Sequence, residues 1–253
     1  MKLLIDIGNT RIKWAMLRDG ELTPQQAVAY EGWTAKQVRD CVLARETRPQ
    51  AVWASNVGGD AIARAVSEAA QQCWSLMPNF VRSTAALCGV TNAYAQPQQL
   101  GVDRLLAVIG AYRQAKGAAC VASIGTAATV DGVTKTGQHL GGVIAPGPDM
   151  MIASLLKNTS DIAQRASASA SSDATSSSLF ASNTLSGVQQ GAAYALAALV
   201  ERALDAMREQ LGESPPLFLT GGAAERVASA LRAPYRLTPD LVLRGLAAAA
   251  DQQ

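Results

Sequence analysis

The chain has 253 residues, of which 49% are hydrophobic and 17% are charged, a balance typical of a globular protein with one large domain or two small ones. A net charge of +2 does not support a general nucleic-acid-binding surface. No apolar run reaches the length of a membrane span, and Met1-Lys2 leads directly into a strand pattern rather than a signal peptide, so we expect a cytoplasmic protein without a membrane partner.

Apolar periodicity predicts alternating strands and helices along the chain. Before a domain boundary that we place at 116/117, giving domains 1–116 and 117–253, the pattern predicts strands at 2–7, 11–18, 51–55 and 80–81 and helices at 34–47, 60–72 and 103–114. After it, the pattern predicts strands at 118–123, 128–134, 139–145 and 217–220 and helices at 149–156, 185–211, 223–231 and 239–250. The serine- and alanine-rich run 165–178 is predicted to be a loop.

Cysteine and histidine usage limits the chemistry. Cys41, Cys73, Cys88 and Cys120 are too widely spaced for a zinc site, and we expect most of them to be buried thiols. The single histidine, His139, is interpreted as a loop residue rather than a catalyst. One histidine also excludes a metal site built from several imidazoles.

A short apolar run ends in the turn Asp6-Ile7-Gly8-Asn9-Thr10. Glycine lets the backbone approach a ligand closely, and exposed N–H groups in such a turn bind anions. A carboxylate beside them is placed to hold a cation such as Mg²⁺, directly or through water. The turn therefore fits a phosphate-plus-metal site, although alone it is also typical of an ordinary hairpin.

Two further buried strands end in glycine turns. Cys120-Val121-Ala122 leads into Ser123-Ile124-Gly125-Thr126-Ala127, which aligns with the first strand and turn, and Leu217-Phe218-Leu219 leads into Thr220-Gly221-Gly222. Two similar strand-turn units suggest two related half-domains that face one nucleotide.

The run Gly101-Val102-Asp103-Arg104 places an acid and a base at a predicted helix start. An acid is common there because it interacts favourably with the helix dipole. Phosphoryl transfer to an alcohol also needs an acceptor for the hydroxyl proton, and a carboxylate substrate needs a cation such as arginine. Asp103 and Arg104 are therefore candidates for these two roles.

In this order the motifs, together with Gly141-Gly142-Val143-Ile144-Ala145-Pro146-Gly147 and Asn183-Thr184, resemble the type III pantothenate kinases. That family belongs to the acetate/sugar-kinase, heat-shock chaperone and actin superfamily. The resemblance implies an α/β fold of two ribonuclease-H-like, actin-type half-domains, each with a mixed sheet flanked by helices, and a nucleotide in the cleft between them. It also implies a homodimer that phosphorylates pantothenate with ATP and Mg²⁺.

The resemblance further implies a role for each matched residue. Asp103 would be the general base, and Asp6 would reach Mg²⁺ through water. The residues implied to bind ATP are Asp6, Gly8, Asn9, Thr10, Lys13, Thr126, Ala127, Gly221 and Gly222. Those implied to bind pantothenate are Tyr94, Gly101, Asp103, Arg104 and Thr184, with Thr184 reaching the pocket of the partner subunit. The small residues Gly187, Gly191 and Ala195 suit either a dimer contact or packing within one subunit.

The chain departs from the family pattern at Ser123, where the family has an acid near its monovalent cation. Serine offers only a neutral oxygen, so the implied K⁺ or NH₄⁺ would be held weakly or by backbone carbonyls. Other functions also fit parts of the sequence: a kinase of the same superfamily for another alcohol, or a catalytically weakened member that regulates transcription. A chaperone-like role would need a peptide-binding domain, for which the chain has no residues left over.

Overall fold

The protein is described by a computed structural model that covers residues 1–168 and 179–252. Contacts divide the chain into two compact units. Unit 1 comprises Met1–Ala119, Asp131–Gly141 and Thr238–Gln253, and unit 2 comprises Cys120–Val130 and Gly142–Leu237. The C-terminal segment thus groups with the N-terminal residues. One boundary at 116/117 does not describe this division, because the chain returns to unit 1 at its end.

Unit 1 is built on a mixed sheet with the strand order β3-β2-β1-β5-β6, in which β4 pairs with β2. The strands are β1 (Lys2–Ile7), β2 (Arg11–Arg18), β3 (Glu21–Leu22), β4 (Gln26–Ala29), β5 (Ala51–Asn56) and β6 (Asn79–Phe80). Strand β1 runs antiparallel to β2 and parallel to β5. Asp19 and Gly20 both have positive φ, as a two-residue hairpin turn requires.

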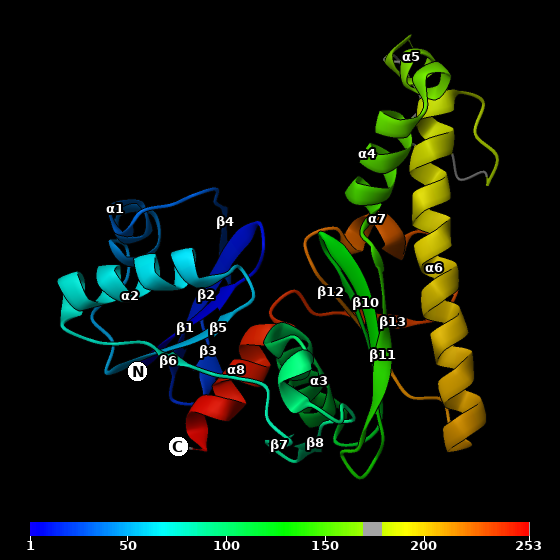
Figure 1. Cartoon of the computed structure of the whole chain (residues 1–253). Helices are drawn as coiled ribbons and strands as arrows, with labels where there is room; N and C mark the ends of the chain where they lie inside the picture. Colours follow the sequence, from blue (N-terminus) through cyan, green and yellow to red (C-terminus); the bar gives the residue numbers. More distant parts are fainter. Residues whose placement is uncertain (169–178, 253) are drawn as a thin grey trace. The chain divides into compact units, whose positions relative to one another are not determined.

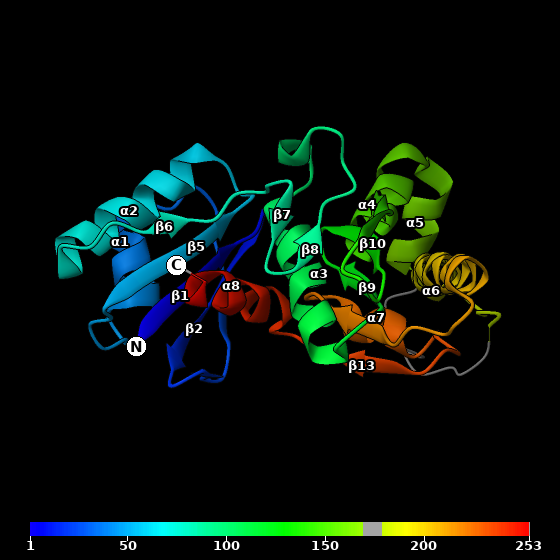
Figure 2. The same ribbon diagram turned by 90° about the horizontal axis from the view of Figure 1, so that it is seen from below.

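Helices lie on both faces of this sheet (Figure 1). Unit 1 contains α1 (Ala35–Val38), η1 (Arg39–Leu43), α2 (Asp60–Trp74), η2 (Pro97–Gln99), α3 (Val102–Ala115) and α8 (Leu241–Asp251), and the short hairpin β7 (Ala86–Leu87) and β8 (Val90–Thr91). Leu3, Ile5 and Ile7 of β1 form a core with Ile62 and Val66 of α2. Helix α8 contacts β1, β2 and β5, as the view from below also shows (Figure 2).

Two helix predictions in unit 1 need correction. The helix expected at 34–47 is α-helical only from Ala35 to Val38 and continues to Leu43 as the π-helix η1. The wider π turn keeps Val38, Val42 and Leu43 buried together. The last helix begins at Leu241, with Asp240 at its N-cap, so Pro239 lies before the helix rather than at its first position.

The C-terminal helix is fixed to the first strand by polar contacts. Lys2 Nζ donates to the Ala250 carbonyl at 2.5 Å and forms a 3.0 Å ion pair with Asp251. The chain termini therefore lie together at one end of the unit (Figure 1). Together with the packing of α8 on α3, β1, β2 and β5, these contacts place the C-terminal segment in unit 1.

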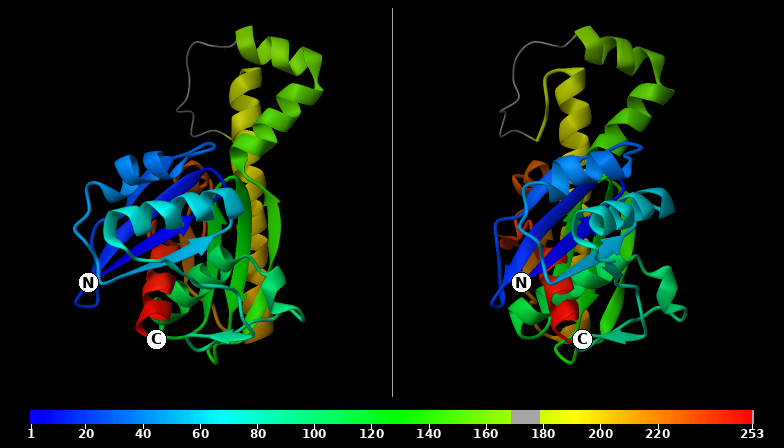
Figure 3. Two further views of the ribbon diagram at one scale, coloured as in Figure 1. Left: turned by 60° about the vertical axis from the view of Figure 1, so that its left-hand side comes forward. Right: turned by 90° about the vertical axis from the view of Figure 1, so that its left-hand side faces the viewer.

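Unit 2 is built on a five-stranded sheet with the strand order β11-β10-β9-β12-β13. Its strands are β9 (Ala119–Ile124), β10 (Ala127–Val133), β11 (His139–Pro146), β12 (Leu217–Thr220) and β13 (Tyr235–Leu237), and its helices are α4 (Pro148–Asn158), α5 (Ser160–Ala168), α6 (Thr184–Leu211) and α7 (Ala224–Ala228). Helices α4 and α5 lie beside the long helix α6 (Figure 3). The outer ends of β10 and β11 belong to unit 1.

The predicted loop 165–178 is only partly described. Helix α5 extends through Ala168, so the loop prediction is wrong for its first four residues, and 169–178 lie outside the described residues. Among the cysteines, Cys88 and Cys120 are buried as expected, Cys73 is partly buried and Cys41 is exposed. In the part of the chain that the structure describes, we find no helix with the length and hydropathy of a membrane span.

Helices α3 and α8 approach each other closely at two glycines. A Cβ atom on Gly245 would collide with the backbone carbonyl of Leu106, and one on Gly110 would collide with the carbonyl of Leu241. The obstacles are backbone atoms, which cannot rotate away as a flexible side chain could. The close approach therefore requires glycine on both helices.

We predict that Gly245→Ala destabilises the protein, since separating α3 from α8 costs about 1–3 kcal/mol or more and outweighs the ~1 kcal/mol that alanine adds in helix propensity. Gly117→Ala is the control, because Gly117, just after α3, has no positive φ and no described atom lies within 4 Å of an added Cβ. Thermal unfolding should show a lower Tm for Gly245→Ala and an unchanged or higher Tm for the control. An equally stable Gly245→Ala protein would contradict the close-packing argument.

Candidate active site

Asp6 is a buried carboxylate at the end of β1. It lies opposite Lys13 in the antiparallel register with β2 and opposite Ser55 in the parallel register with β5. The Ser55 hydroxyl donates to Asp6 Oδ1 at 2.8 Å, and both side chains are buried. Burial raises the pKa of Asp6 to about 6, against the lowering influence of Lys13 and Ser55, and the charge of Asp103 raises it further.

The turn after Asp6 is held by Tyr30, a residue that the sequence analysis missed. The Tyr30 hydroxyl donates to the Gly8 carbonyl at 2.6 Å, and the Tyr30 backbone N–H donates to the Thr10 carbonyl at 3.1 Å. A Cβ atom on Gly58 would collide with this hydroxyl, so Gly58 makes room for the clamp. Because both carbonyls are engaged on the Tyr30 side, the exposed side chains of Asn9 and Thr10 are presented on a fixed backbone.

Asp103 lies in the first turn of α3, half-buried behind Gly101. Its Oδ1 accepts from the Arg104 backbone N–H at 2.8 Å, and a Cβ atom on residue 101 would stand 2.7 Å from that oxygen. Burial raises the pKa of the Asp103 carboxyl, Arg104 opposes that rise, and Asp131 adds to it. Desolvation thus makes this carboxylate a stronger base than an exposed aspartate.

Arg104 is buried and forms a bidentate ion pair with Asp131. Its Nε donates to Asp131 Oδ2 at 3.0 Å and its Nη2 donates to Oδ1 at 2.6 Å, while Nη1 donates to the Tyr94 hydroxyl at 3.0 Å. The guanidinium also stands 5.8 Å from the centre of the Tyr94 ring. Desolvation alone would lower the pKa of Arg104, but the hydrogen bond and charge of Asp131 raise it overall.

His139 is not a loop residue, so that expectation is wrong. It is 1% exposed at the start of β11, and its Nε2 lies 3.0 Å from Asp131 Oδ1. Tyr94, Arg104, Asp131 and His139 therefore form one cluster in unit 1. Asp131 was missed in this role, although an acid inside the apolar run Val130-Asp131-Gly132-Val133 signals a buried partner.

In unit 2, three glycine turns meet around Gly125-Thr126. The Gly147 N–H donates to the Thr126 carbonyl at 2.9 Å, and a Cβ atom on Gly147 would collide with the Gly125 carbonyl. Gly221 has φ of +102°, and a Cβ there would collide with the Ile124 backbone. Gly147, which the sequence analysis gave only as part of a matched motif, therefore also helps to shape this site.

The remaining matched residues of unit 2 lie at the ends of the same strands. Ser123 of β9 pairs with Thr220 of β12, directly before the Gly221-Gly222 turn. Ser123 is partly buried, whereas Thr126, Ala127 and Gly222 are exposed. The carboxyl ends of adjacent parallel strands therefore carry both turns, the usual place for a ligand in an α/β sheet.

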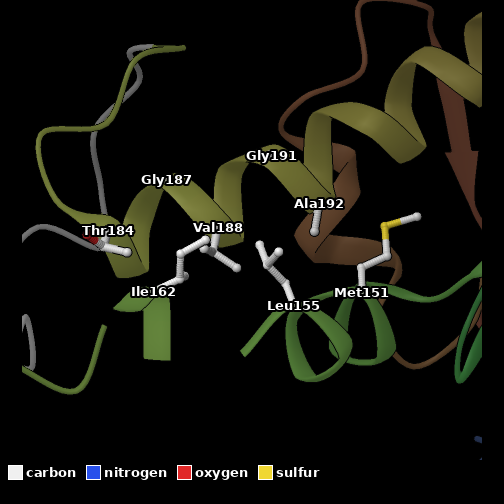
Figure 4. Close-up of a pocket in the computed structure, with 8 residues that line it drawn as sticks. All are labelled: Met151, Leu155, Ile162, Thr184, Gly187, Val188, Gly191 and Ala192. Atoms are coloured by element: carbon white, nitrogen blue, oxygen red, sulfur yellow. The ribbon is translucent and has the colours of Figure 1, made fainter. Parts of the chain in front are cut away.

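Thr184 begins α6, where the side chain of Asn183 caps the helix by accepting from the Ser186 N–H at 2.9 Å. It lines a mainly apolar pocket of about 380 Å³ between α6 and helices α4 and α5 (Figure 4). The other lining residues are Met151, Leu155, Ile162, Gly187, Val188, Gly191 and Ala192. Thr184 thus belongs to unit 2, whereas Tyr94 and Arg104 belong to unit 1.

The residues of the first turn fit a hydrated divalent cation. Within residues 1–168 and 179–252 we find no group of three or more histidine, cysteine or acidic side chains that could enclose a metal. Mg²⁺ needs no such cage, because it binds through one or two carboxylates, waters and substrate phosphates. The buried Asp6 carboxylate, whose pKa is raised mainly by desolvation, suits this mode.

The raised pKa of Asp6 predicts a pH-dependent stability. Between pH ~4 and ~6 the folded state binds more protons than the unfolded state, so Asp6 lowers stability as pH rises through that window, by up to ~3 kcal/mol. Asp6→Asn removes this titration. In metal-free urea unfolding, we expect the variant to exceed the native protein in stability at pH 7.5 and to lose that advantage near pH 4. A difference that does not change with pH would contradict the assignment.

Comparison with known proteins identifies the family. The family model for type III pantothenate kinase matches residues 2–206. The chain is 34% identical to the type III pantothenate kinase of Nitrosococcus oceani, covering 98% of this chain and 92% of the relative. It is 36% identical to that of Paraburkholderia phymatum, covering 99% and 94%.

Solved structures share the fold at lower identity. A Campylobacter jejuni protein, named as a Baf-family transcriptional activator, has a TM-score of 0.57 and 22% identity over 99% of this chain and 98% of its own. Component A of (R)-2-hydroxyglutaryl-CoA dehydratase from Acidaminococcus fermentans has a TM-score of 0.53 and 16% identity over 98% and 95%. These likenesses confirm the predicted α/β fold of mixed sheets flanked by helices. By its family match and its full-length relatives, the chain belongs to the type III pantothenate kinase family.

Proposed function

We propose that the protein transfers a phosphoryl group from ATP to the hydroxyl of pantothenate, giving 4'-phosphopantothenate and ADP, the first step of coenzyme A biosynthesis. The observation that carries this proposal is the pairing, at the start of α3, of a desolvated carboxylate on Asp103 with the buried guanidinium of Arg104. Pantothenate carries a hydroxyl and a carboxylate, which are the groups that such a base and such a cation recognise.

In the proposed reaction, Asp103 orients the substrate hydroxyl and accepts its proton. Transfer through a loose transition state depends more on positioning than on base strength, so the modest basicity gained by burial is sufficient. Arg104 binds the substrate carboxylate, with Tyr94 and Gly101 beside it. Thr184 would complete this pocket from a partner subunit.

ATP would be held by the glycine turns that follow β1, β9 and β12. The first turn contributes Asp6, Gly8, Asn9, Thr10 and Lys13, the second contributes Thr126 and Ala127, and Gly221 and Gly222 lie on the adenosine side. Turn N–H groups and threonine hydroxyls stabilise charge that develops on the transferred group. Mg²⁺ held by Asp6 through water would neutralise charge on phosphate oxygens. A monovalent cation near Ser123 would rely on backbone carbonyls.

We further propose a cytoplasmic homodimer whose subunits consist of two half-domains that divide near 116/117, with the C-terminal segment from Thr238 grouped with the first of them. The observation that favours a subunit contact on α6 is the open space around Gly191, where an added Cβ meets nothing within 4 Å. Cytoplasmic ATP is the natural phosphoryl donor for a biosynthetic kinase.

ADP release from purified protein with MgATP, measured with and without pantothenate in K⁺ and then in Na⁺ buffer, tests the function. We expect release that depends on pantothenate, and the two buffers show whether the Ser123 site still needs K⁺. If folded protein releases no ADP in response to pantothenate in either buffer, another alcohol acceptor or a regulatory role becomes the better account.

Replacing Asp103 by asparagine should keep ATP binding and lower kcat by about 10²–10⁴-fold, the usual loss when a general base is removed. Asp60→Asn is the matched control, because Asp60 also lies in a first helical turn but is exposed. Calorimetric ATP titration and steady-state kinetics provide the two measurements. Near-normal turnover of Asp103→Asn would remove Asp103 from the mechanism.

Replacing Tyr30 by phenylalanine should raise KM for ATP by about 10-fold, since the Gly8 carbonyl loses its hydrogen bond and the first turn loosens. KM for pantothenate should stay within about 2-fold. Tyr112→Phe provides the comparison, because the Tyr112 hydroxyl also donates to a backbone carbonyl, that of Lys135, at 3.4 Å. Equal KM values for ATP in both variants and the native protein would refute the clamp.

A further inference from the structure

A continuous buried polar cluster lies behind Arg104. Asp131 is 2% exposed and His139 is 1% exposed, and they come from β10 and β11, whereas Arg104 comes from α3. Asp131 Oδ1 is shared, accepting from Arg104 Nη2 at 2.6 Å and lying 3.0 Å from His139 Nε2. The order of contact is therefore His139, Asp131, Arg104.

Stability alone does not explain why the protein buries this polar cluster. Burying a carboxylate and a guanidinium costs several kcal/mol, which their attraction offsets only when the geometry is good and the remaining polar atoms are bonded. Apolar residues of similar size would fill the same space without that cost. The arrangement instead fixes the orientation of the arginine, because a bidentate pair holds the planar guanidinium in one position.

In this orientation two N–H bonds of the Arg104 guanidinium remain available to a ligand. A guanidinium has five N–H bonds. Asp131 takes one from Nε and one from Nη2, and Tyr94 takes one from Nη1. One N–H remains on each terminal nitrogen, enough for two hydrogen bonds to the oxygens of a substrate carboxylate.

His139 completes the support as a neutral donor. Asp131 Oδ1 can only accept while ionised, so we assign the imidazole proton to Nε2. Nδ1 is buried and has no hydrogen-bond partner among the described residues, so a proton there would lack an acceptor. The Tyr94 ring stacks on the imidazole, with ring centres 6.3 Å apart and planes inclined by 11°.

We propose that Asp131 and His139 are positioning residues that hold the Arg104 guanidinium in place, so that its two remaining N–H bonds select a substrate bearing a carboxylate. Asp131 acts directly on Arg104, and His139 acts through Asp131. This inference deepens the proposed function and rests on it, because the substrate carboxylate is that of pantothenate.

The test compares His139→Phe, which removes the donor, with His139→Gln, whose amide nitrogen can replace Nε2–H. Kinetics are measured with pantothenate and with its analogue in which a primary alcohol replaces the carboxylate. We expect His139→Phe to raise KM for pantothenate about 10-fold and to reduce the preference for the carboxylate about 10-fold, the loss expected for one hydrogen bond to a charged group. KM for ATP should change less than about 2-fold, and His139→Gln should retain most of the preference.

Two further variants separate positioning from loss of stability. Asp131→Asn places an amide donor against the guanidinium, and we expect its preference for the carboxylate to fall by about 100-fold. Val133→Ala removes buried volume from the same strand, β10, and leaves every polar group of the cluster in place, so the preference should be unchanged. An unchanged preference in His139→Phe, or an equal loss in Val133→Ala, would overturn the proposal.

A second measurement separates failure of the proposed kinase function from failure of the positioning role. If the native protein shows no pantothenate-dependent turnover, the same variants are compared by calorimetric titration with pantothenate. Weaker binding to His139→Phe than to His139→Gln would then support the positioning role without the kinase reaction. Absence of binding to the native protein, or equal binding to both variants, would refute it.

Discussion

The bidentate ion pair between Arg104 and Asp131 is the interaction on which the candidate substrate site of unit 1 depends. It joins the start of α3 to β10 in a buried position, where Arg104 is 7% exposed and Asp131 is 2% exposed. Once this contact is fixed, Asp103 is fixed too, since it precedes Arg104 on the same helical turn and accepts from its backbone N–H. The base and the cation are thus oriented as one rigid unit.

Burial dominates the electrostatics of two candidate acids in unit 1, because desolvation is the largest cause of the raised pKa values of Asp6 and Asp103. The charge of Asp103 raises the pKa of Asp6 further, and the charge of Asp131 raises that of Asp103. Lys13 opposes the rise at Asp6, and Arg104 opposes it at Asp103. A region with excess buried negative charge is costly for the protein alone and is suited to a divalent cation and its phosphate ligands.

Local sequence patterns were enough to predict several strands and helices and two residues of the candidate site. Strands β1 and β2 and helices α2, α3 and α6 follow from periodicity. Asp103 and Arg104 stand beside each other in a recognisable motif. The family match then confirmed the identification that the ordered motifs had suggested.

The missed residues are those whose partners are distant in the chain. Ser55 reaches Asp6 across 49 residues through strand register, and Tyr30 reaches Gly8 across 22. The predicted strands 128–134 and 139–145 contain Asp131 and His139, but the sequence does not give the register that brings these two side chains within 3.0 Å. Register and helix crossing decide such contacts, and a single sequence does not encode them in any local pattern.

A crystal structure of the protein with pantothenate and a non-hydrolysable ATP analogue would show whether Arg104, held by Asp131, binds the substrate carboxylate. We expect the carboxylate on Arg104 Nη1 and Nη2, the substrate hydroxyl within hydrogen-bond distance of Asp103, and the Arg104–Asp131 pair intact. A carboxylate bound elsewhere, or an Arg104 side chain that leaves Asp131 to reach it, would refute the role of this ion pair.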